Sequence, residues 1–207
     1  MRTVLLPVKD FKTAKQRLAQ ALTSRQRAQL ARAMLSDVLT ALSGARRPER
    51  VVVYTGSEEV ADVVRPFDFD IVQETDVCGH SVAVNKMVQE LSRFATHILA
   101  IAGDLPLLKP QEVDSVFDTT PTGLSLVSSR DGTGTNAALF VMPARITMEY
   151  GDGSLRRHLA NAEQARIRAA VLSIPGIEFD VDTPEDIRSY TRLGPNPSHT
   201  WRFVSTL

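Results

Sequence analysis

The sequence predicts an α/β fold in which a mixed, mostly parallel sheet lies between two layers of helices. Three observations carry this prediction. Short apolar runs alternate with longer segments whose apolar residues recur at helical spacing. The run HILAIA at residues 97–102 is unbroken, which is typical of a parallel strand covered on both faces. Beyond residue 120, two apolar runs flank a glycine-rich turn, which indicates an antiparallel pair.

The first strand and the first helix carry the clearest boundary signals. Residues 3–8 form the first apolar run, and Pro7 marks its end because proline lacks the N–H that sheet pairing needs. A polar loop follows. Thr23 and Gln26 then have the spacing of a capping box, and apolar residues at helical spacing continue to Gly44. We expect one amphipathic helix over that range.

The remaining elements follow from the same patterns. Helices are expected at residues 58–64, 81–94, 110–117, 154–165 and 184–193. Strands are expected at residues 51–55, 69–72, 97–102, 124–127, 137–141, 169–174 and 179–181. A chain of 207 residues suits one α/β core, so residues 1–193 are interpreted as a single domain. Residues 194–207 are interpreted as a loosely held C-terminal tail whose Trp201 and Phe203 could dock on a neighbouring surface.

Composition excludes several classes of protein. Hydrophobic residues make up 43% of the chain and charged residues 23%, which is typical of a globular protein rather than a disordered one. Lys+Arg and Asp+Glu number 24 each, so no overall positive field favours nucleic acid as a partner. The single Cys78 rules out an internal disulfide, and no apolar run is long enough for a signal peptide or a membrane span. These features predict a cytoplasmic protein without a membrane partner.

A basic loop follows the first predicted strand. It contains Lys9, Lys12, Lys15 and Arg17. An open α/β sheet presents its ligand crevice beyond the carboxyl ends of its strands, and ammonium and guanidinium groups neutralise phosphate oxygens there. The loop is therefore a candidate triphosphate site. The alternative is a solvated basic turn with no ligand.

Three aspartates are candidate metal ligands. Asp104 follows the apolar run at residues 97–102, and Asp180 and Asp182 lie two residues apart, which places them on one face of an extended strand. Carboxylates gathered on one face favour a cation between them, and hard oxygen ligands beside phosphates favour Mg²⁺ over zinc. The alternative for Asp182 is that it caps the helix that begins at Thr183 and Pro184.

Two further segments are candidate anion sites. The turn at residues 131–136, DGTGTN, offers N–H and hydroxyl donors, although such a string is also an ordinary hairpin turn. Residues 150–154, YGDGS, open a predicted helix, whose N-terminus favours a phosphate or a carboxylate. The four histidines are His80, His97, His158 and His199. They do not have the spacing of zinc ligands, and no Gly-x-Ser-x-Gly motif lies near them, so a zinc site and a serine hydrolase are both disfavoured.

Five strings in order resemble the 2-phospho-L-lactate guanylyltransferase family of coenzyme F-420 biosynthesis. They are PVKDFKTAKQRL, GDLPLL, DGTGTNAAL, YGDGSLRRHL and DVDTPEDI, and the match spans roughly residues 3–193. The resemblance implies a Rossmann-like, GT-A-like fold of the nucleotide-diphospho-sugar transferase kind. It also implies GTP as donor and release of pyrophosphate. Members of this family use 2-phospho-L-lactate, phosphoenolpyruvate or 3-phospho-D-glycerate as acceptor.

The resemblance also assigns roles to residues. It implies that Asp104, Asp180 and Asp182 hold Mg²⁺, that Thr135, Gly151 and Ser154 contact the acid, and that Lys9, Lys15 and Arg17 serve the triphosphate. Residues 84–87 read VNKM, where relatives often read Leu-Asn-x-Ala. The asparagine of that pattern is present as Asn85, so the resemblance still implies that Asn85 contacts the nucleotide.

Other functions are compatible with the same pattern. The chain could be a nucleotidyltransferase of the same fold that acts on a sugar phosphate or the molybdenum cofactor, or a nucleotide-binding domain that has lost the reaction. The sequence is also compatible with a homodimer.

Overall fold

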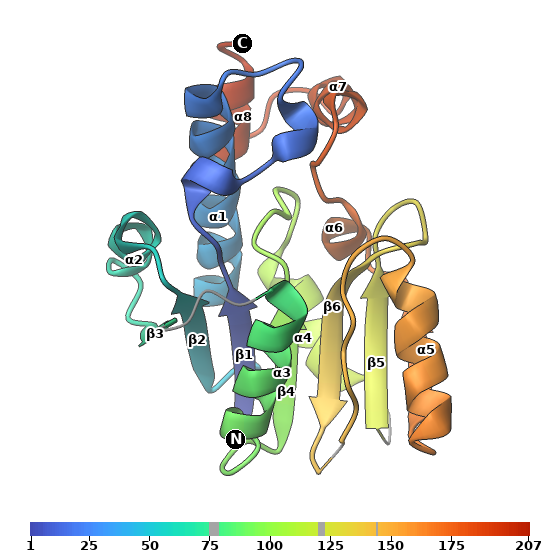
Figure 1. Ribbon diagram of the computed structural model, residues 1–207. Coiled ribbons are helices and arrows are strands. Elements are labelled where there is room, and N and C mark those ends of the chain that lie inside the picture. The colour runs from blue at the N-terminus through green and yellow to red at the C-terminus, as the bar shows by residue number, and fades with distance from the viewer. Residues whose placement is uncertain (75–78, 120–122, 144) are drawn as a thin grey trace.

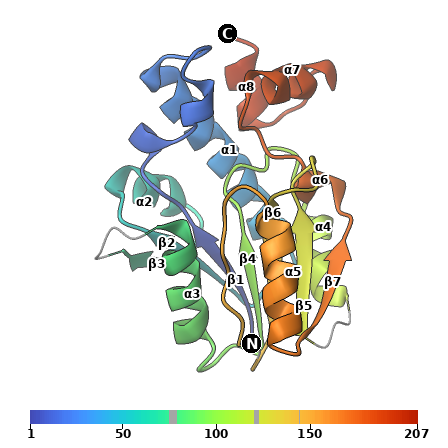
Figure 2. The ribbon, with the colours of Figure 1, turned by 45° about the vertical axis from the view of Figure 1, so that its right-hand side comes forward.

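The computed structural model describes residues 1–207 except 75–78, 120–122 and 144. Its centre is a seven-stranded sheet with strand order β3-β2-β1-β4-β6-β5-β7 (Figures 1 and 2). The strands are β1 (Arg2–Pro7), β2 (Arg50–Thr55), β3 (Asp70–Gln73), β4 (His97–Ile101), β5 (Gly123–Ser128), β6 (Thr135–Val141) and β7 (Arg168–Leu172). Strand β6 runs antiparallel to its neighbours β4 and β5, whereas the other recorded pairings are parallel. The predicted mixed, mostly parallel sheet is confirmed.

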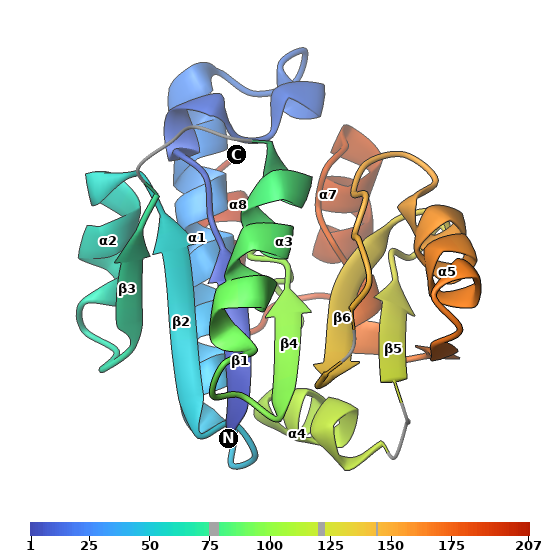
Figure 3. The ribbon, with the colours of Figure 1, turned by 60° about the horizontal axis from the view of Figure 1, so that its bottom comes forward.

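Helices cover both faces of the sheet (Figures 2 and 3). They are α1 (Ser24–Gly44), α2 (Glu58–Val64), α3 (His80–Leu91), α4 (Pro110–Asp118), α5 (Ser154–Gln164), α6 (Pro175–Glu178), α7 (Pro184–Arg192) and α8 (His199–Val204). Two short 3-10 turns, η1 (Phe11–Thr13) and η2 (Gln16–Leu18), lie between β1 and α1. The predicted three-layer arrangement is confirmed.

Alternation along β1 divides the core into two layers. Val4 and Leu6 pack in the cluster under α1, α2 and α4, whereas Leu5 packs in the opposite cluster under α3 and α5. Successive side chains of a strand point to opposite faces, so a fully apolar strand such as β1 serves both clusters at once. This is why the central strands read as unbroken apolar runs.

The C-terminal residues pack on α1 and do not form a loose tail. Helix α8 lies beside α1 in Figure 1, and Trp201 and Phe203 pack against a third apolar cluster built around Leu30 and Tyr190. Asp37 of α1 accepts hydrogen bonds of 2.7 and 2.9 Å from the first two N–H groups of α8. The expectation of a loosely held tail is therefore wrong, and the alternative, docking of the two aromatic side chains, is confirmed. The division of the chain at residue 193 stays a prediction.

Residues 179–181 do not form the expected strand. Pro175 begins the short helix α6, and the chain then runs without regular structure to α7. Phe179 and Val181 are buried in the third cluster, and the Asn136 side chain donates to the carbonyl oxygen of Ile177 at 2.9 Å. The apolar side chains of this segment are therefore buried without strand pairing. The Asn136 side chain, rather than a neighbouring strand, supplies a hydrogen bond to its backbone.

No helix in the described parts of the chain is both long and apolar enough to cross a membrane.

Candidate functional site: a carboxylate cleft at the strand ends

The site lies where the strand order changes direction. Strands β2 and β3 extend to one side of β1, and β4 lies on its other side, so the carboxyl ends of β1 and β4 border the crevice that open α/β sheets use for ligands. The basic loop follows β1, and Asp104 follows β4. Because β6 is antiparallel to β4, its first residues, Thr135 and Asn136, enter at the same edge.

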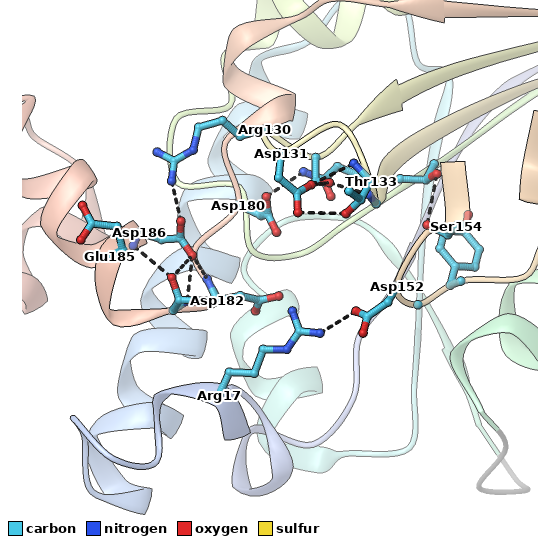
Figure 4. Close-up of a pocket in the computed structure, with 17 residues that line it drawn as sticks. Arg17, Arg130, Asp131, Thr133, Asp152, Ser154, Asp180, Asp182, Glu185 and Asp186 are labelled. Atoms are coloured by element: carbon cyan, nitrogen blue, oxygen red, sulfur yellow. Dashed lines mark hydrogen bonds and ion pairs between the residues drawn. The ribbon is translucent and has the colours of Figure 1, made fainter. Parts of the chain in front are cut away.

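Two adjoining pockets form one cleft at this edge. The larger pocket has a volume of about 470 Å³ and the smaller about 290 Å³. Three residues line both of them, namely Asn136, Asp180 and Asp182. Figure 4 shows the larger pocket, with Asp180 and Asp182 on one side and Ser154 on the other. Together the pockets fall within the size range of small-ligand sites.

Lys15 joins the aspartates of two different loops. Its Nζ lies 2.5 Å from Asp104 Oδ2 and 2.6 Å from Asp182 Oδ1, and its side chain is only 6% exposed. Burial opposes the charge of Lys15, but the two carboxylates outweigh burial and raise its pKa above the ordinary value. Lys15 also adopts a left-handed backbone conformation, with φ of 54°, which is costly for a residue other than glycine. The ammonium is therefore held in place as a cation.

Asp180 is the third carboxylate of the cleft. Burial, followed by the charge of Asp104, raises the pKa of Asp180 to about 6. Asn136 donates a hydrogen bond of 3.2 Å to Asp180 Oδ1, which partly opposes this shift. We call Lys15, Asp104, Asp180 and Asp182 the carboxylate junction.

The donor chemistry of the carboxylate junction suits a hard divalent cation. Three carboxylates face one cleft, and Lys15 places a single positive charge between two of them. Within the described residues, no three His, Cys, Asp or Glu side chains are grouped closely enough to hold a metal ion, and the Lys15 ammonium contacts two of the three carboxylates. The three aspartates therefore match Mg²⁺ in ligand type but, with Lys15 between two of them, not in spacing.

Asp182 does not cap helix α7. The N-cap is Thr183, which accepts from the N–H of Asp186, and the Asp186 side chain accepts in return from the N–H of Thr183. The alternative interpretation of Asp182 as a helix cap is wrong, so its carboxylate is available to the cleft.

Arginine side chains flank the larger pocket (Figure 4). Arg17 extends from the basic loop and contacts Asp152 Oδ1 at 2.7 Å across the pocket. Arg130 contacts Asp186 Oδ1 at 2.6 Å, and its guanidinium lies 4.7 Å from the centre of the Phe179 ring. Either guanidinium group can bind phosphate or carboxylate oxygens of a ligand if it gives up its present aspartate partner.

Of the glycine-rich string at residues 131–136, residues 131–134 lie in the β5–β6 hairpin turn and the last two begin β6, and both parts contribute residues to the larger pocket. Asp131 accepts from the Ser129 hydroxyl at 2.6 Å and from the Thr133 N–H at 2.9 Å, and these bonds lower its pKa to about 2. The Gly134 N–H donates to Ser129 Oγ at 2.7 Å. Two N–H groups of the turn are therefore used within it rather than offered to an anion.

Hydroxyl groups face the larger pocket beyond this turn. Ser154, the first residue of α5, donates to Thr135 Oγ1 at 3.4 Å, and both residues line the pocket with Gly151. Gly151 has φ of 113°, a conformation that side chains rarely adopt. We call Thr135 and Ser154 the hydroxyl pair.

Comparison with known proteins agrees with this geometry. Residues 1–204 match the family described as guanylyl transferase CofC-like. The chain belongs to this family. It is 35% identical to the phosphoenolpyruvate guanylyltransferase of Conexibacter woesei, covering 91% of this chain and 86% of that one. It is 31% identical to the enzyme of the same name from Sphaerobacter thermophilus, covering 92% and 93% of the two chains.

Solved structures show the same fold. A protein assigned as a nucleotide-diphospho-sugar transferase from Desulfovibrio desulfuricans superposes with a TM-score of 0.80 at 16% identity, over all of this chain and 95% of the other. A cytidylyltransferase from Leptospira borgpetersenii gives a TM-score of 0.61 at 12% identity, over all of this chain and 93% of the other. Together with the family match, these results confirm the predicted fold class and a nucleotidyltransferase that transfers guanylyl groups and therefore uses GTP.

Not every residue predicted for this guanylyltransferase reaches the cleft. Lys9 lines the smaller pocket, but Lys12 lines neither and pairs with Glu59 on the surface at 3.0 Å. Asn85 also lines neither pocket, because its amide exchanges two 2.9 Å hydrogen bonds with the backbone of Met148. The structure therefore gives no support to nucleotide contacts by Lys12 and Asn85.

Several residues that build the cleft of the guanylyltransferase were not predicted individually. Arg130, Asn136 and Asp152 line the larger pocket, whereas His158 lines neither pocket but contacts Thr135. Asn136, Asp152 and His158 lie inside the strings that carry the family resemblance, which was the available signal. Their contacts join segments far apart in the chain, and a single sequence shows no such pairing.

Proposed function

We propose that the chain transfers GMP from GTP to the phosphate of a phosphorylated three-carbon acid, with phosphoenolpyruvate as the acceptor, and that pyrophosphate is released. The observation that carries this proposal is a two-part cleft with the carboxylate junction where its parts meet. The choice of acceptor is supported by the names of the relatives, which are 31% and 35% identical to this chain.

In this proposal each pocket takes one substrate. The nucleotide would enter the smaller pocket, between the loop after β1 and the end of β4, so that its phosphates reach Lys15. The acid would bind in the larger pocket near Gly151 and the hydroxyl pair, where Arg17 adds a positive charge. This arrangement brings the phosphate of the acid and the α-phosphate of GTP together at the carboxylate junction.

The reaction needs no general base. An oxygen of the acid's phosphate attacks the α-phosphorus of GTP, and the bond from that phosphorus to the oxygen bridging to the β-phosphate breaks. The bond's electron pair leaves with pyrophosphate, and a diphosphate link joins GMP to the acid. A phosphate monoester has a second pKa of about 6, so the nucleophile is already largely a dianion at neutral pH.

Catalysis would rest on positioning and charge. Lys15 and Arg17 offset negative charge on phosphate oxygens, and holding both substrates in line can contribute about 7–11 kcal/mol in favourable cases. Mg²⁺ is part of the proposal. Asp104, Asp180 and Asp182 would hold it, and it would supply further charge neutralisation at the phosphates.

We also propose that this transfer is a step of coenzyme F-420 biosynthesis in the cytoplasm. The homodimer stays a prediction from the sequence.

The test is pyrophosphate release by the purified protein with GTP and Mg²⁺. Phosphoenolpyruvate, 2-phospho-L-lactate, 3-phospho-D-glycerate and glucose 1-phosphate are supplied separately. We expect release with phosphoenolpyruvate to be fastest and release with glucose 1-phosphate to match the reaction without acceptor. Release with the sugar phosphate alone would overturn the proposal. Faster release with another three-carbon acid would replace phosphoenolpyruvate as the acceptor and leave the proposed GMP transfer in place.

A further inference from the structure

His158 is a buried histidine of α5 that holds two parts of the larger pocket. Its side chain is fully buried, and both ring nitrogens have partners. Nε2 accepts a hydrogen bond of 2.9 Å from the N–H of Glu149. Nδ1 lies 3.0 Å from Thr135 Oγ1.

These contacts determine the tautomer of the ring. A backbone N–H can only donate, so Nε2 must be the unprotonated nitrogen, and the proton of the neutral ring is on Nδ1. Nδ1–H then donates to Thr135 Oγ1. Burial, followed by the charge of Arg157, lowers the pKa of His158 to about 4, which agrees with a neutral ring at physiological pH.

The tautomer in turn sets the direction of the Thr135 hydroxyl. Thr135 Oγ1 accepts from His158 Nδ1–H and from the Ser154 hydroxyl at 3.4 Å. A hydroxyl has two acceptor lone pairs and one donor hydrogen, so these two bonds leave its O–H free to donate. Because Thr135 lines the larger pocket, that hydrogen can be given to an anionic oxygen there.

The second contact of His158 anchors the loop before α5. The bond to the Glu149 N–H fixes the residue that precedes Tyr150, whose ring lies edge-on to His158 with centroids 5.0 Å apart. Tyr150 and Gly151 both line the larger pocket. One side chain thus ties the start of β6 to a loop that lines the pocket.

We propose that His158 is a positioning residue for the acid substrate, which aims the Thr135 hydroxyl and holds the loop at residues 149–153 beside it. The proposal rests on the proposed function, because it takes the larger pocket as the acid site. His158 itself does not touch the substrate. Its effect should therefore appear in acid binding and not in GTP binding.

Two substitutions separate the two contacts. In His158→Asn, the amide nitrogen can occupy the place of Nδ1 and donate to Thr135. In His158→Gln, the amide oxygen can occupy the place of Nε2 and accept from Glu149, but the donor to Thr135 is lost. His97→Asn is the matched control, because His97 lies at the opposite end of β4 from Asp104. Thermal unfolding of each variant reports its stability separately.

We expect His158→Gln to raise KM for the acid about tenfold, the effect of losing roughly one hydrogen bond, while KM for GTP stays unchanged. His158→Asn should raise KM for the acid about threefold or less. In a Thr135→Val background, His158→Gln should cause little further loss, because the two changes remove the same contact. Equal changes in both KM values, or a lower melting temperature with an unchanged KM for the acid, would overturn the assignment.

Binding of phosphoenolpyruvate by calorimetry separates this proposal from the proposed function. If the wild type releases no pyrophosphate with any acid, the proposed function fails. Phosphoenolpyruvate binding weakened about tenfold in His158→Gln, and less in His158→Asn, would then still support the positioning role. Equal binding by wild type and both variants, or no binding by the wild type, would overturn it.

Discussion

The carboxylate junction and the hydroxyl pair hold their polar groups by different physical means. At the junction, Lys15 gains two short ion pairs that outweigh the cost of its burial. At the hydroxyl pair, Thr135 is oriented by the neutral ring of His158 and by the Ser154 hydroxyl. Charge at the junction suits the stabilisation of reacting phosphates, whereas neutral, directed donors suit recognition of a particular acid. Substitutions at the first should therefore reduce turnover, and those at the second should weaken acid binding.

Asp104→Asn should have the largest effect on turnover. The amide keeps the size of the side chain and can still accept from Lys15, so the fold should survive, but one charged ligand of the junction is lost. We expect kcat for Mg²⁺-dependent pyrophosphate release to fall about 10³-fold with little change in melting temperature. Asp118→Asn, a surface aspartate of α4 paired with Arg47, is the control and should keep full activity. Full activity in Asp104→Asn would show that the metal assignment is wrong.

Lys15→Met should reduce turnover about 10²-fold and also change cation binding. The substitution removes the ammonium from between Asp104 and Asp182, so the carboxylates lose the positive charge that competes with a divalent ion. Without nucleotide, calorimetry should therefore detect tighter Mg²⁺ binding than in the wild type. Lys86→Met, on the exposed face of α3, should leave both properties unchanged. Weaker Mg²⁺ binding in Lys15→Met would mean that Lys15 supports the metal site instead of competing with it.

The charged residues of the cleft could be predicted because they follow apolar strands. Asp104 comes after β4 and Lys15 lies in the loop after β1, and the topological rule for open sheets places both at the same edge. Asp180 and Asp182 line the same cleft, although residues 179–181 do not form the strand that was expected to align them. Burial of Phe179 and Val181 in the third cluster brings this segment to the cleft instead.

The neutral contacts could not be predicted in the same way. In the sequence His158 belongs to no motif. Its partners are Thr135 and the backbone of Glu149, which are not metal ligands and do not lie at a spacing from His158 that a known motif uses. The docking of α8 likewise depends on Asp37, which is more than 160 residues from its N–H partners. Local patterns predict which residues form an element, but contacts between distant polar groups appear only once the sheet order is known.

Asp180→Asn tests how strongly the carboxylate junction favours a protonated Asp180. The folded pKa of Asp180, about 6, lies above the ordinary value of 3.8, so the folded state binds this proton more tightly. Its favourable contribution is full below about pH 4 and is lost as pH rises through 6. The melting temperature of Asp180→Asn relative to wild type should therefore rise between pH 4 and pH 7, by roughly 2–4 °C after allowance for solvent screening.

The measurement is thermal unfolding at both pH values without divalent ions. Asp118→Asn is again the control. Because Asp118 lies on the surface, the melting temperature of this variant relative to wild type should not rise between pH 4 and pH 7. A relative melting temperature for Asp180→Asn that falls from pH 4 to pH 7 would show that the Asp180 carboxylate is stabilised in its charged form.

Lys12→Met should have the smallest effect, and it tests the structure against the sequence directly. Lys12 lies in the same basic loop as Lys15, and the residue pattern alone places both in the candidate triphosphate site. In the folded protein Lys12 is exposed and pairs with Glu59, and such exposed pairs contribute little because solvent screens them. We expect KM for GTP and kcat to change less than about threefold. A tenfold rise in KM for GTP would mean that nucleotide binding draws Lys12 away from Glu59. The contacts of Lys12 seen in this structure would then not predict whether it binds phosphate.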